Sequence, residues 1–127
     1  MNEPQKVETV FKQWDRARAL LIPAVPELKG THTIDDICLM VGAGHFRVWM
    51  GEQSVVLSEF TQTPRIKALN LFLCGGDLSE LRGMLDAQIV PYARANGCTR
   101  ITGAGRAGWS RVPSDWTRGG VYMHIDI

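Results

Sequence analysis

The strongest constraint in the sequence is a change of hydrophobic period at the glycine pair Gly75-Gly76. Before the pair, residues 66–74 carry leucine at every second position from 69 to 73, the spacing of one face of a β-strand. After the pair, apolar residues recur three or four positions apart over 78–92, the spacing of one helical face. Asp77, followed three residues later by a glutamate, is typical of a helix N-cap. The sequence therefore predicts a strand that ends at the glycine pair and leads directly into a helix.

The sequence before strand 66–74 predicts two helices and two more strands. The first helix ends at Pro23 and Pro26, and the second begins at a capping box formed by Thr33 and Asp36. Short connections between the strands favour an antiparallel meander. The predicted elements are helices at 7–22 and 33–44 and strands at 45–50, 54–61 and 66–74.

The sequence after the helix that follows Asp77 predicts one more strand, beside strand 66–74. The helix that begins after Asp77 is weakened by Gly83, is expected to kink near Pro91, and ends at Asn96-Gly97. Because a helix separates them, strand 98–102 should lie parallel to strand 66–74. Residues 106–116 are interrupted by glycine and proline and hold at most a short helix, and 121–127 is expected to be a final strand.

Composition excludes several classes of protein. The chain has 127 residues, the size of one domain spanning 1–127. Its 14 basic and 13 acidic residues give a net charge too small to indicate nucleic-acid binding by bulk electrostatics. No apolar run reaches the roughly 18 residues of a membrane span, and the N-terminus lacks the apolar stretch of a secretory signal. The three cysteines contain no CxxC pair, so neither a disulfide framework nor a metal site is expected. We expect a soluble protein that is not secreted.

This order of elements resembles the GNAT acetyltransferase fold, a mixed, mostly antiparallel sheet flanked by helices. The residues that carry the resemblance are the junction 71–77 (LFLCGGD), the segment 96–98 (NGC) and the segment 105–109 (GRAGW). With the short length, they look most like small GNAT-like proteins of tailed bacteriophages. The resemblance implies an α+β fold and a location in the host cytoplasm or the virion, as an internal or ejected virion component or an assembly factor.

The cofactor loop of the family departs from its pattern in this sequence. The resemblance implies that acetyl-CoA would bind where strand 66–74 meets the next helix, through Cys74, Gly75 and Gly76, helped by Arg82 and Arg106. Phe72 and Leu73 stand where the family has Arg or Gln, and Asp77 stands where it has the second Gly or Ala. A capping aspartate would occupy the amides that a pyrophosphate needs and would repel it. We therefore expect no bound cofactor, with acetyl-CoA as the alternative.

The catalytic residues of the family are not matched either. The family often has a glutamate base on this strand and a tyrosine acid near the fourth helix, but residues 66–73 contain no acid and residues 103–118 contain no tyrosine. If the chain is active, Glu59 is the base and Ser110 the group that protonates a leaving thiolate. Glu59 could equally be a solvated residue on the outer face of the meander. The sequence favours a protein that binds rather than catalyses, with an N-acetyltransferase as the alternative.

The C-terminal part of the sequence carries a local excess of positive charge. Residues 87–125 contain five arginines and a single acid, Asp115, a local charge of +4. Arginine beside tryptophan is typical of protein-interface hot spots, so a protein partner is preferred to nucleic acid, which remains a third alternative. An unpaired sheet edge would also allow a homo-oligomer. The predicted binding surface is Arg94, Arg100, Arg106, Trp109, Arg111, Trp116 and Arg118.

Overall fold

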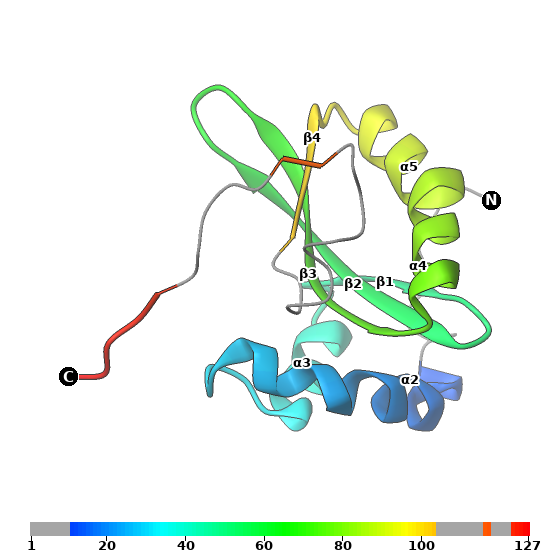
Figure 1. The fold of residues 1–127 in the computed structure, drawn as a ribbon, viewed down its shortest axis with the longest axis vertical. Helices are drawn as coiled ribbons and strands as arrows, with labels where there is room; N and C mark the ends of the chain where they lie inside the picture. Colours follow the sequence, from blue (N-terminus) through cyan, green and yellow to red (C-terminus); the bar gives the residue numbers. More distant parts are fainter. Residues whose placement is uncertain (1–10, 104–115, 118–122) are drawn as a thin grey trace.

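A four-stranded sheet organises the computed structural model, which describes residues 11–103, 116–117 and 123–127 (Figure 1). Neighbouring strands follow in the order β1-β2-β3-β4. The first three strands pair antiparallel and β4 pairs parallel to β3, which confirms the predicted meander and crossover. The strands are β1 (Arg47–Met50), β2 (Ser54–Gln62), β3 (Lys67–Gly76) and β4 (Arg100–Gly103). The fold is thus a mixed α+β arrangement with a mostly antiparallel sheet, as the sequence predicts.

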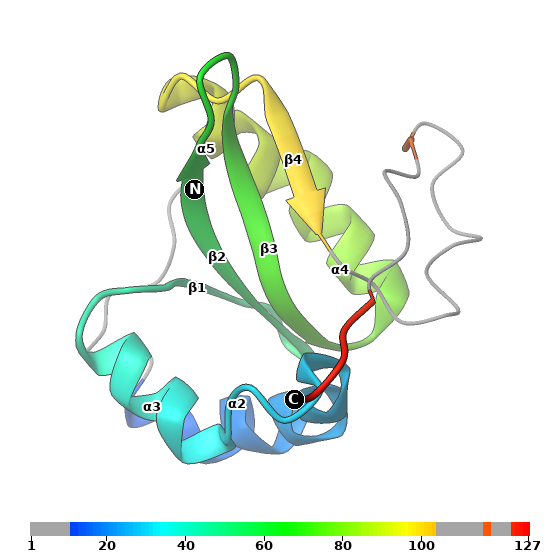
Figure 2. The ribbon, with the colours of Figure 1, turned by 90° about the vertical axis from the view of Figure 1, so that its left-hand side faces the viewer.

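Helical segments cover both faces of the sheet (Figures 1 and 2). The first group packs on one face and consists of α2 (Trp14–Leu21), the 3-10 segment η1 (Ile22–Leu28) and α3 (Ile34–Gly42). The second group packs on the other face and consists of α4 (Leu78–Met84), the π-helical turn η2 (Leu85–Ile89) and α5 (Val90–Ala95). The result is a three-layer arrangement with the sheet in the middle.

Local sequence rules account for where the first helices begin and end. The capping box is confirmed: the Asp36 N–H donates to Thr33 Oγ1 at 3.1 Å, and the Thr33 N–H donates to Asp36 Oδ2 at 2.8 Å. Pro23 ends the α-helix as predicted, but the chain continues as the 3-10 segment to Leu28, with Pro26 inside it. The prediction that the prolines end the helix is therefore correct only for its α-helical part, because 3-10 geometry tolerates them. The predicted start at residue 7 lies outside the described residues.

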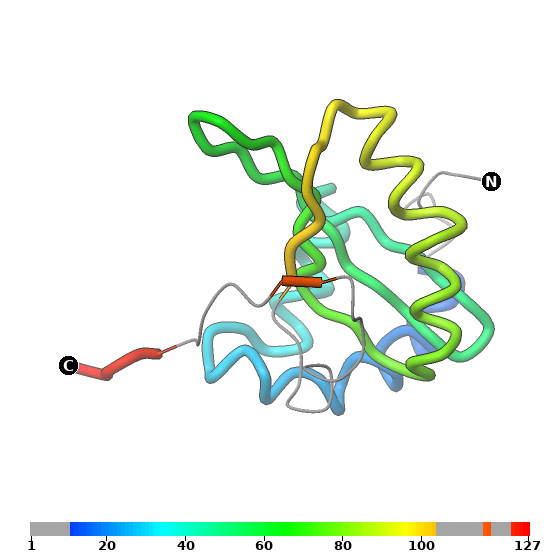
Figure 3. Tube along the Cα trace, turned by 45° about the horizontal axis from the view of Figure 1, so that its top comes forward, coloured from blue at the N-terminus to red at the C-terminus, as the bar shows by residue number. Residues whose placement is uncertain are grey.

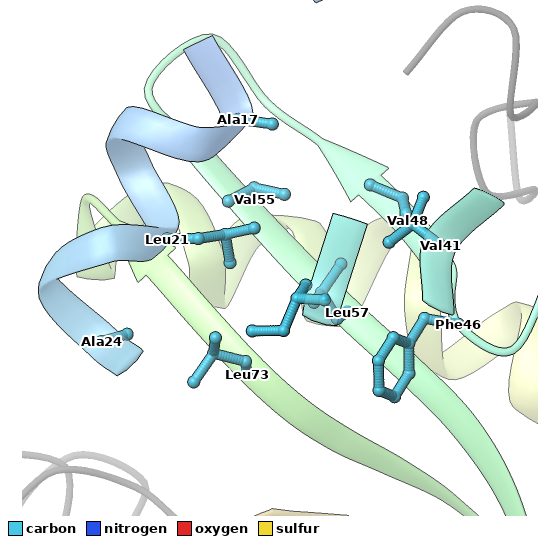
Figure 4. Packing of buried hydrophobic residues seen from close by; sticks show 10 residues of the cluster. Ala17, Leu21, Ala24, Val41, Phe46, Val48, Val55, Leu57 and Leu73 are labelled. Atoms are coloured by element: carbon cyan, nitrogen blue, oxygen red, sulfur yellow. The ribbon is translucent and has the colours of Figure 1, made fainter. Parts of the chain in front are cut away.

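A first core lies between the sheet and the first group of helices (Figure 4). Leu21 from α2 and Val41 from α3 meet the strand residues Val55 and Leu57, and all four side chains are fully buried. Figure 4 shows Leu73 of β3 and Phe46 beside them. This core holds α2 against the carboxyl end of β3.

A second core lies between the sheet and the helices after β3. Trp49, Val56 and Leu69 are fully buried there against Ile89 of the π-helical turn. In that turn the Val90 N–H donates to the Leu85 carbonyl, five residues back. The helix is thus irregular just before Pro91, which has no N–H for a regular helix, at the place where the sequence predicts a kink.

Strand β3 contains a bulge and runs further than the sequence predicts. Leu57 lies opposite Leu73, whereas Ser58 lies opposite Leu71, so Phe72 is an extra residue in β3. Gly75 and Gly76 do not end the strand, because they pair with Val55 and Ser54 of β2. The prediction that the glycine pair breaks the strand is wrong, since ladder hydrogen bonds continue to the residue before Asp77.

The final strand predicted at 121–127 is not formed by the residues of that range that the structure describes. Residues 123–127 form no strand and extend away from the sheet, as Figures 1 and 3 show. Residues 121 and 122 lie outside the described part of the chain. Within the described ranges no helix has the length and apolar character to cross a membrane.

Candidate functional site

The junction between β3 and α4 is the position where the family resemblance places a cofactor. Asp77 precedes α4 in extended conformation, and its Oδ2 accepts the Glu80 N–H at 3.3 Å. The Asp77 N–H in turn donates to Ser54 Oγ at 3.1 Å and to the Gln53 carbonyl at 3.2 Å. The predicted helix cap is therefore confirmed, and the N-terminus of α4 already has a carboxylate on it.

Both glycines before Asp77 are packed against other parts of the chain. A Cβ on Gly75 would lie 2.0 Å from the carbonyl oxygen of Leu20, at the end of α2. A Cβ on Gly76 would lie 2.1 Å from the Gln53 carbonyl oxygen, and Gly76 has a positive φ of 112°. Real Cβ atoms do not approach within 3.0 Å, so internal packing alone requires glycine at both positions. The glycine pair therefore needs no ligand to explain it.

Glu80 ties the first turn of α4 to the turn between β1 and β2. Its carboxylate accepts the Gln53 N–H at 2.9 Å and the Glu52 N–H at 3.1 Å. A hydrogen bond from the Ser54 hydroxyl, followed by that from the Gln53 N–H, lowers the pKa of Glu80 below its ordinary value. A second negative charge thus lies beside Asp77, so the residues present do not fit a pyrophosphate at this helix end.

The other residues of the predicted cofactor site are engaged within the protein. Cys74 is half-buried and packs on the second core. Arg82 lies one turn into α4, with its Nε 3.1 Å from Asp86 Oδ2. Arg106 lies outside the described residues. Cys74 and Arg82 therefore both have contacts within the described part of the chain.

A row of polar side chains crosses the sheet on the face that carries α2 and α3. Glu59 of β2 is its centre: Asn70 Nδ2 donates to Glu59 Oε2 at 3.1 Å, and His45 Nε2 lies 3.2 Å from Glu59 Oε1. On β4, Thr102 Oγ1 donates to Asn70 Oδ1 at 2.8 Å. The Glu59 side chain is 23% exposed and that of His45 50% exposed. We call these four residues the polar row.

Glu59 is therefore neither isolated nor simply solvated. Figure 2 shows α2 and α3 at one end of the strands. One carboxylate oxygen faces an imidazole and the other an amide. These two contacts keep the carboxylate of Glu59 in a fixed orientation.

An aromatic group borders the polar row. Phe46 and Phe72 stack with ring centroids 4.5 Å apart, and Phe72 is the bulged residue of β3. His45 packs edge-on against Phe46 at 4.6 Å, and His32 packs edge-on against Phe72 at 5.1 Å. The bulge is what brings Phe72 to this face beside Leu73. Edge-to-face and stacked contacts of this kind fix the ring of His45 next to Glu59.

Four basic residues of the described part of the chain lie at one end of the sheet. Arg65, Arg94 and Arg100 are exposed there, around Lys67 at the start of β3. Lys67 Nζ donates to the Asn96 carbonyl at 2.7 Å, which joins β3 to the end of α5, and the Thr99 N–H donates to the Lys67 carbonyl.

We call Arg65, Lys67, Arg94 and Arg100 the basic end. No acid occurs in 60–76 or 87–103, the segments that form it. None of the three arginines has an ion-pair partner among the described residues.

The predicted binding surface is thus brought together only in part. Arg94 and Arg100 lie at the basic end, joined by Arg65 and Lys67, which sequence reasoning did not include. Trp116 is half-buried and packs on the second core, so it is not the freely exposed anchor that the hot-spot interpretation requires. Ser110, Arg106, Trp109, Arg111 and Arg118 lie outside the described residues.

Of the polar row, only Glu59 was predicted from the sequence; His45, Asn70 and Thr102 were not. Counting outward from the turn at 63–66 pairs Glu59 with Asn70, so the register of the hairpin was a usable signal for Asn70. Thr102 lies near this pair because the crossover places β4 beside β3, and His45 lies there because of the path of the chain just before β1. No local sequence pattern indicates either position. Among the described residues, no three His, Cys, Asp or Glu side chains lie together in a group that could hold a metal ion.

Comparisons with known proteins identify the fold. Models of known protein families give no match, and neither do curated protein sequences. Solved structures do match: TTHA1254 from Thermus thermophilus has a TM-score of 0.58 as wild type and 0.60 as a point mutant. Each shares 14% identity, covering 98% of this chain and 94% of that one. A tetramutant of BH1408 from Bacillus halodurans has a TM-score of 0.56 and 14% identity, over 78% of this chain and 77% of that one. At this identity the similarity shows the fold alone.

Proposed function

We propose that this chain is a non-catalytic binding protein with a GNAT-like fold, and that it binds a protein partner through an acidic surface of that partner. The observation that carries the proposal is the carboxylate of Asp77 on the N-terminus of α4. Glu80 adds a second carboxylate within the same turn. A diphosphate would have to displace one acid and lie beside another, which opposes binding of acetyl-CoA.

Isothermal titration with acetyl-CoA tests this part of the proposal. We expect no saturable heat up to about 1 mM ligand, a range in which even weak cofactor binding is measurable. Ser79 provides a matched pair of variants, because it is exposed at the second position of α4. Micromolar binding that Ser79→Asp abolishes and Ser79→Ala retains would contradict the proposal. Substitution of Gly75 is unsuitable, since any side chain there meets Leu20.

The basic end is the surface that we assign to the partner. Its three exposed arginines lack ion-pair partners among the described residues and face no nearby acid in the two segments that build it. Arginine forms bidentate hydrogen bonds with carboxylates, which suits an acidic protein surface.

Fluorescence anisotropy with a labelled glutamate-rich peptide tests this surface. The double variant Arg65→Gln/Arg94→Gln is expected to lose binding, whereas Arg18→Gln, an exposed arginine of α2, should retain it. A duplex DNA probe in the same assay tests the nucleic-acid alternative. Binding to DNA alone, falling steeply between about 50 and about 200 mM salt, would replace the protein partner with a nucleic-acid backbone.

The resemblance to small phage proteins supplies the biological setting of the proposal. It implies an internal or ejected virion component, or an assembly factor, in the host cytoplasm or the virion. We expect the gene to lie beside genes for portal, tail or ejection proteins. A neighbourhood of metabolic genes would contradict this setting.

The second candidate function is an N-acetyltransferase, and the polar row favours it. Glu59 lies on the strand next to the family's usual position for the base, and Asn70 reaches it from that position. An assay for acetyl transfer to amines, monitored by thiol release, is expected to show no turnover. Turnover that Glu59→Gln abolishes and Asp35→Asn retains would establish this function instead.

A further inference from the structure

The segment 123–127 has the side-chain pattern of a strand without a sheet. Met123, Ile125 and Ile127 alternate with two polar residues, and their exposed fractions are 82%, 85% and 118%. His124 Nε2 lies 3.9 Å from Asp126 Oδ1, so the two polar side chains share the opposite side. Apolar side chains at every second position are typical of a strand with one face packed on a core, and here all three are exposed.

Strand β4 offers the matching edge. It pairs with β3 on one side and with no other strand in the described part of the chain. Its Ile101 packs on the second core, whereas Thr102 points to the polar row on the other face. Arg100 shares the face of Thr102, because alternate residues of a strand point the same way. An edge with unpaired backbone groups and one apolar position is a template for one more strand.

The two patterns fit in a single antiparallel register. With Ile125 opposite Ile101, Asp126 lies opposite Arg100 and His124 opposite Thr102. The apolar residues of the segment then cover the second core, and the opposite charges form a cross-strand pair. A parallel register would place His124 opposite Arg100 and forgo that pair. The charges therefore select the antiparallel arrangement.

In its own chain the segment lies away from the body of the protein, as Figures 1 and 3 show. We propose that residues 123–127 add as an antiparallel strand to β4 of a second copy of the chain. Reciprocal exchange of the two segments then closes a twofold-symmetric homodimer. The dimer would engage Arg100 of the basic end but would leave Arg65 and Arg94 accessible, so the double variant of those two arginines tests the proposed function separately from the dimer.

Light scattering during gel filtration of the full chain tests the dimer. At about 100 µM we expect the mass of a dimer, dissociating on dilution. Ile125→Lys should weaken the dimer by about tenfold or more, because it removes an apolar residue from the new interface. Leu39→Lys is the control, since Leu39 is 74% exposed on α3 and far from both strands in sequence. A monomer at about 100 µM, or equal effects of the two variants, would overturn the proposal.

A charge exchange tests the register. Asp126→Arg and Arg100→Asp should each weaken the dimer, and the double variant should restore it towards the wild-type dissociation constant. Hydrogen exchange of residues 123–127 provides the second measurement. Protection that disappears on dilution supports exchange between copies, whereas protection in a monomer would mean pairing within one chain and would overturn the proposal.

Discussion

Replacing Gly75 with alanine separates the two explanations for the glycine pair. If the glycine exists because α2 lies against β3, the substitution damages the fold. If it exists for a phosphate, the substitution leaves stability unchanged and weakens binding of the ligand. Gly75 has no positive φ, so a methyl group costs nothing in backbone conformation there and the effect is steric.

The magnitude follows from the packing. The new Cβ would lie 2.0 Å from the Leu20 oxygen, against a minimum near 3.0 Å, so backbone atoms must separate by about 1 Å. The neighbouring Leu21 is fully buried in the first core, which resists such a displacement. Overpacking of this kind costs about 1–3 kcal/mol of the free energy of unfolding.

Urea denaturation measures the effect, with Gly83→Ala as the matched control. A Cβ on Gly83 meets nothing within 4 Å, and alanine is a better helix former than glycine by about 0.5–1 kcal/mol. The two Gly→Ala variants should therefore change the unfolding midpoint in opposite directions. A Gly75→Ala protein as stable as the wild type would refute the packing argument.

Three further predictions concern stability. Glu80→Gln should make the free energy of unfolding fall less steeply with decreasing pH. The folded-state pKa of Glu80 is lowered, so its contribution to stability is present above pH 4.5 and is lost as the pH falls through the lowered pKa. Urea midpoints measured across this pH range will detect the difference. Trp49→Phe should cost about 2–4 kcal/mol in the same assay, because it removes buried volume and the 3.0 Å hydrogen bond from Nε1 to Ser58 Oγ. A cost below about 0.5 kcal/mol, the range of ordinary surface substitutions, would contradict this. Thr33→Ala should cost about 1 kcal/mol by removing one half of the capping box, and Thr33→Ser, which keeps the hydroxyl, should restore most of it.

Local interactions explain which parts of the fold the sequence predicts well. The capping box at Thr33 and the cap at Asp77 each depend on residues three positions apart, so both can be recognised without knowing the fold. The meander follows from short turns, and the parallel placement of β4 follows from the handedness of crossovers. The failures occur where a distant segment intervenes.

The role of the glycine pair is the clearest such case. Glycines between a strand and a helix indicate a break or a phosphate loop when read alone. The contacts of Gly75 and Gly76 are with Leu20 and Gln53, which lie 55 and 23 positions earlier in the chain. No local pattern contains that information.

The candidate site divides in the same way. From the sequence alone Glu59 could be named as the only acid near the expected position, but its partners His45, Asn70 and Thr102 come from three other parts of the chain. Likewise, the sequence shows an arginine-rich C-terminal part, whereas only the folded chain groups Arg94 and Arg100 with Arg65 and places Trp116 against the core. Short-range hydrogen bonding and hydrophobic period determine the elements and their order. Which side chains become neighbours depends on how the sheet brings distant strands within about 5 Å of one another, and that is decided only by tertiary packing.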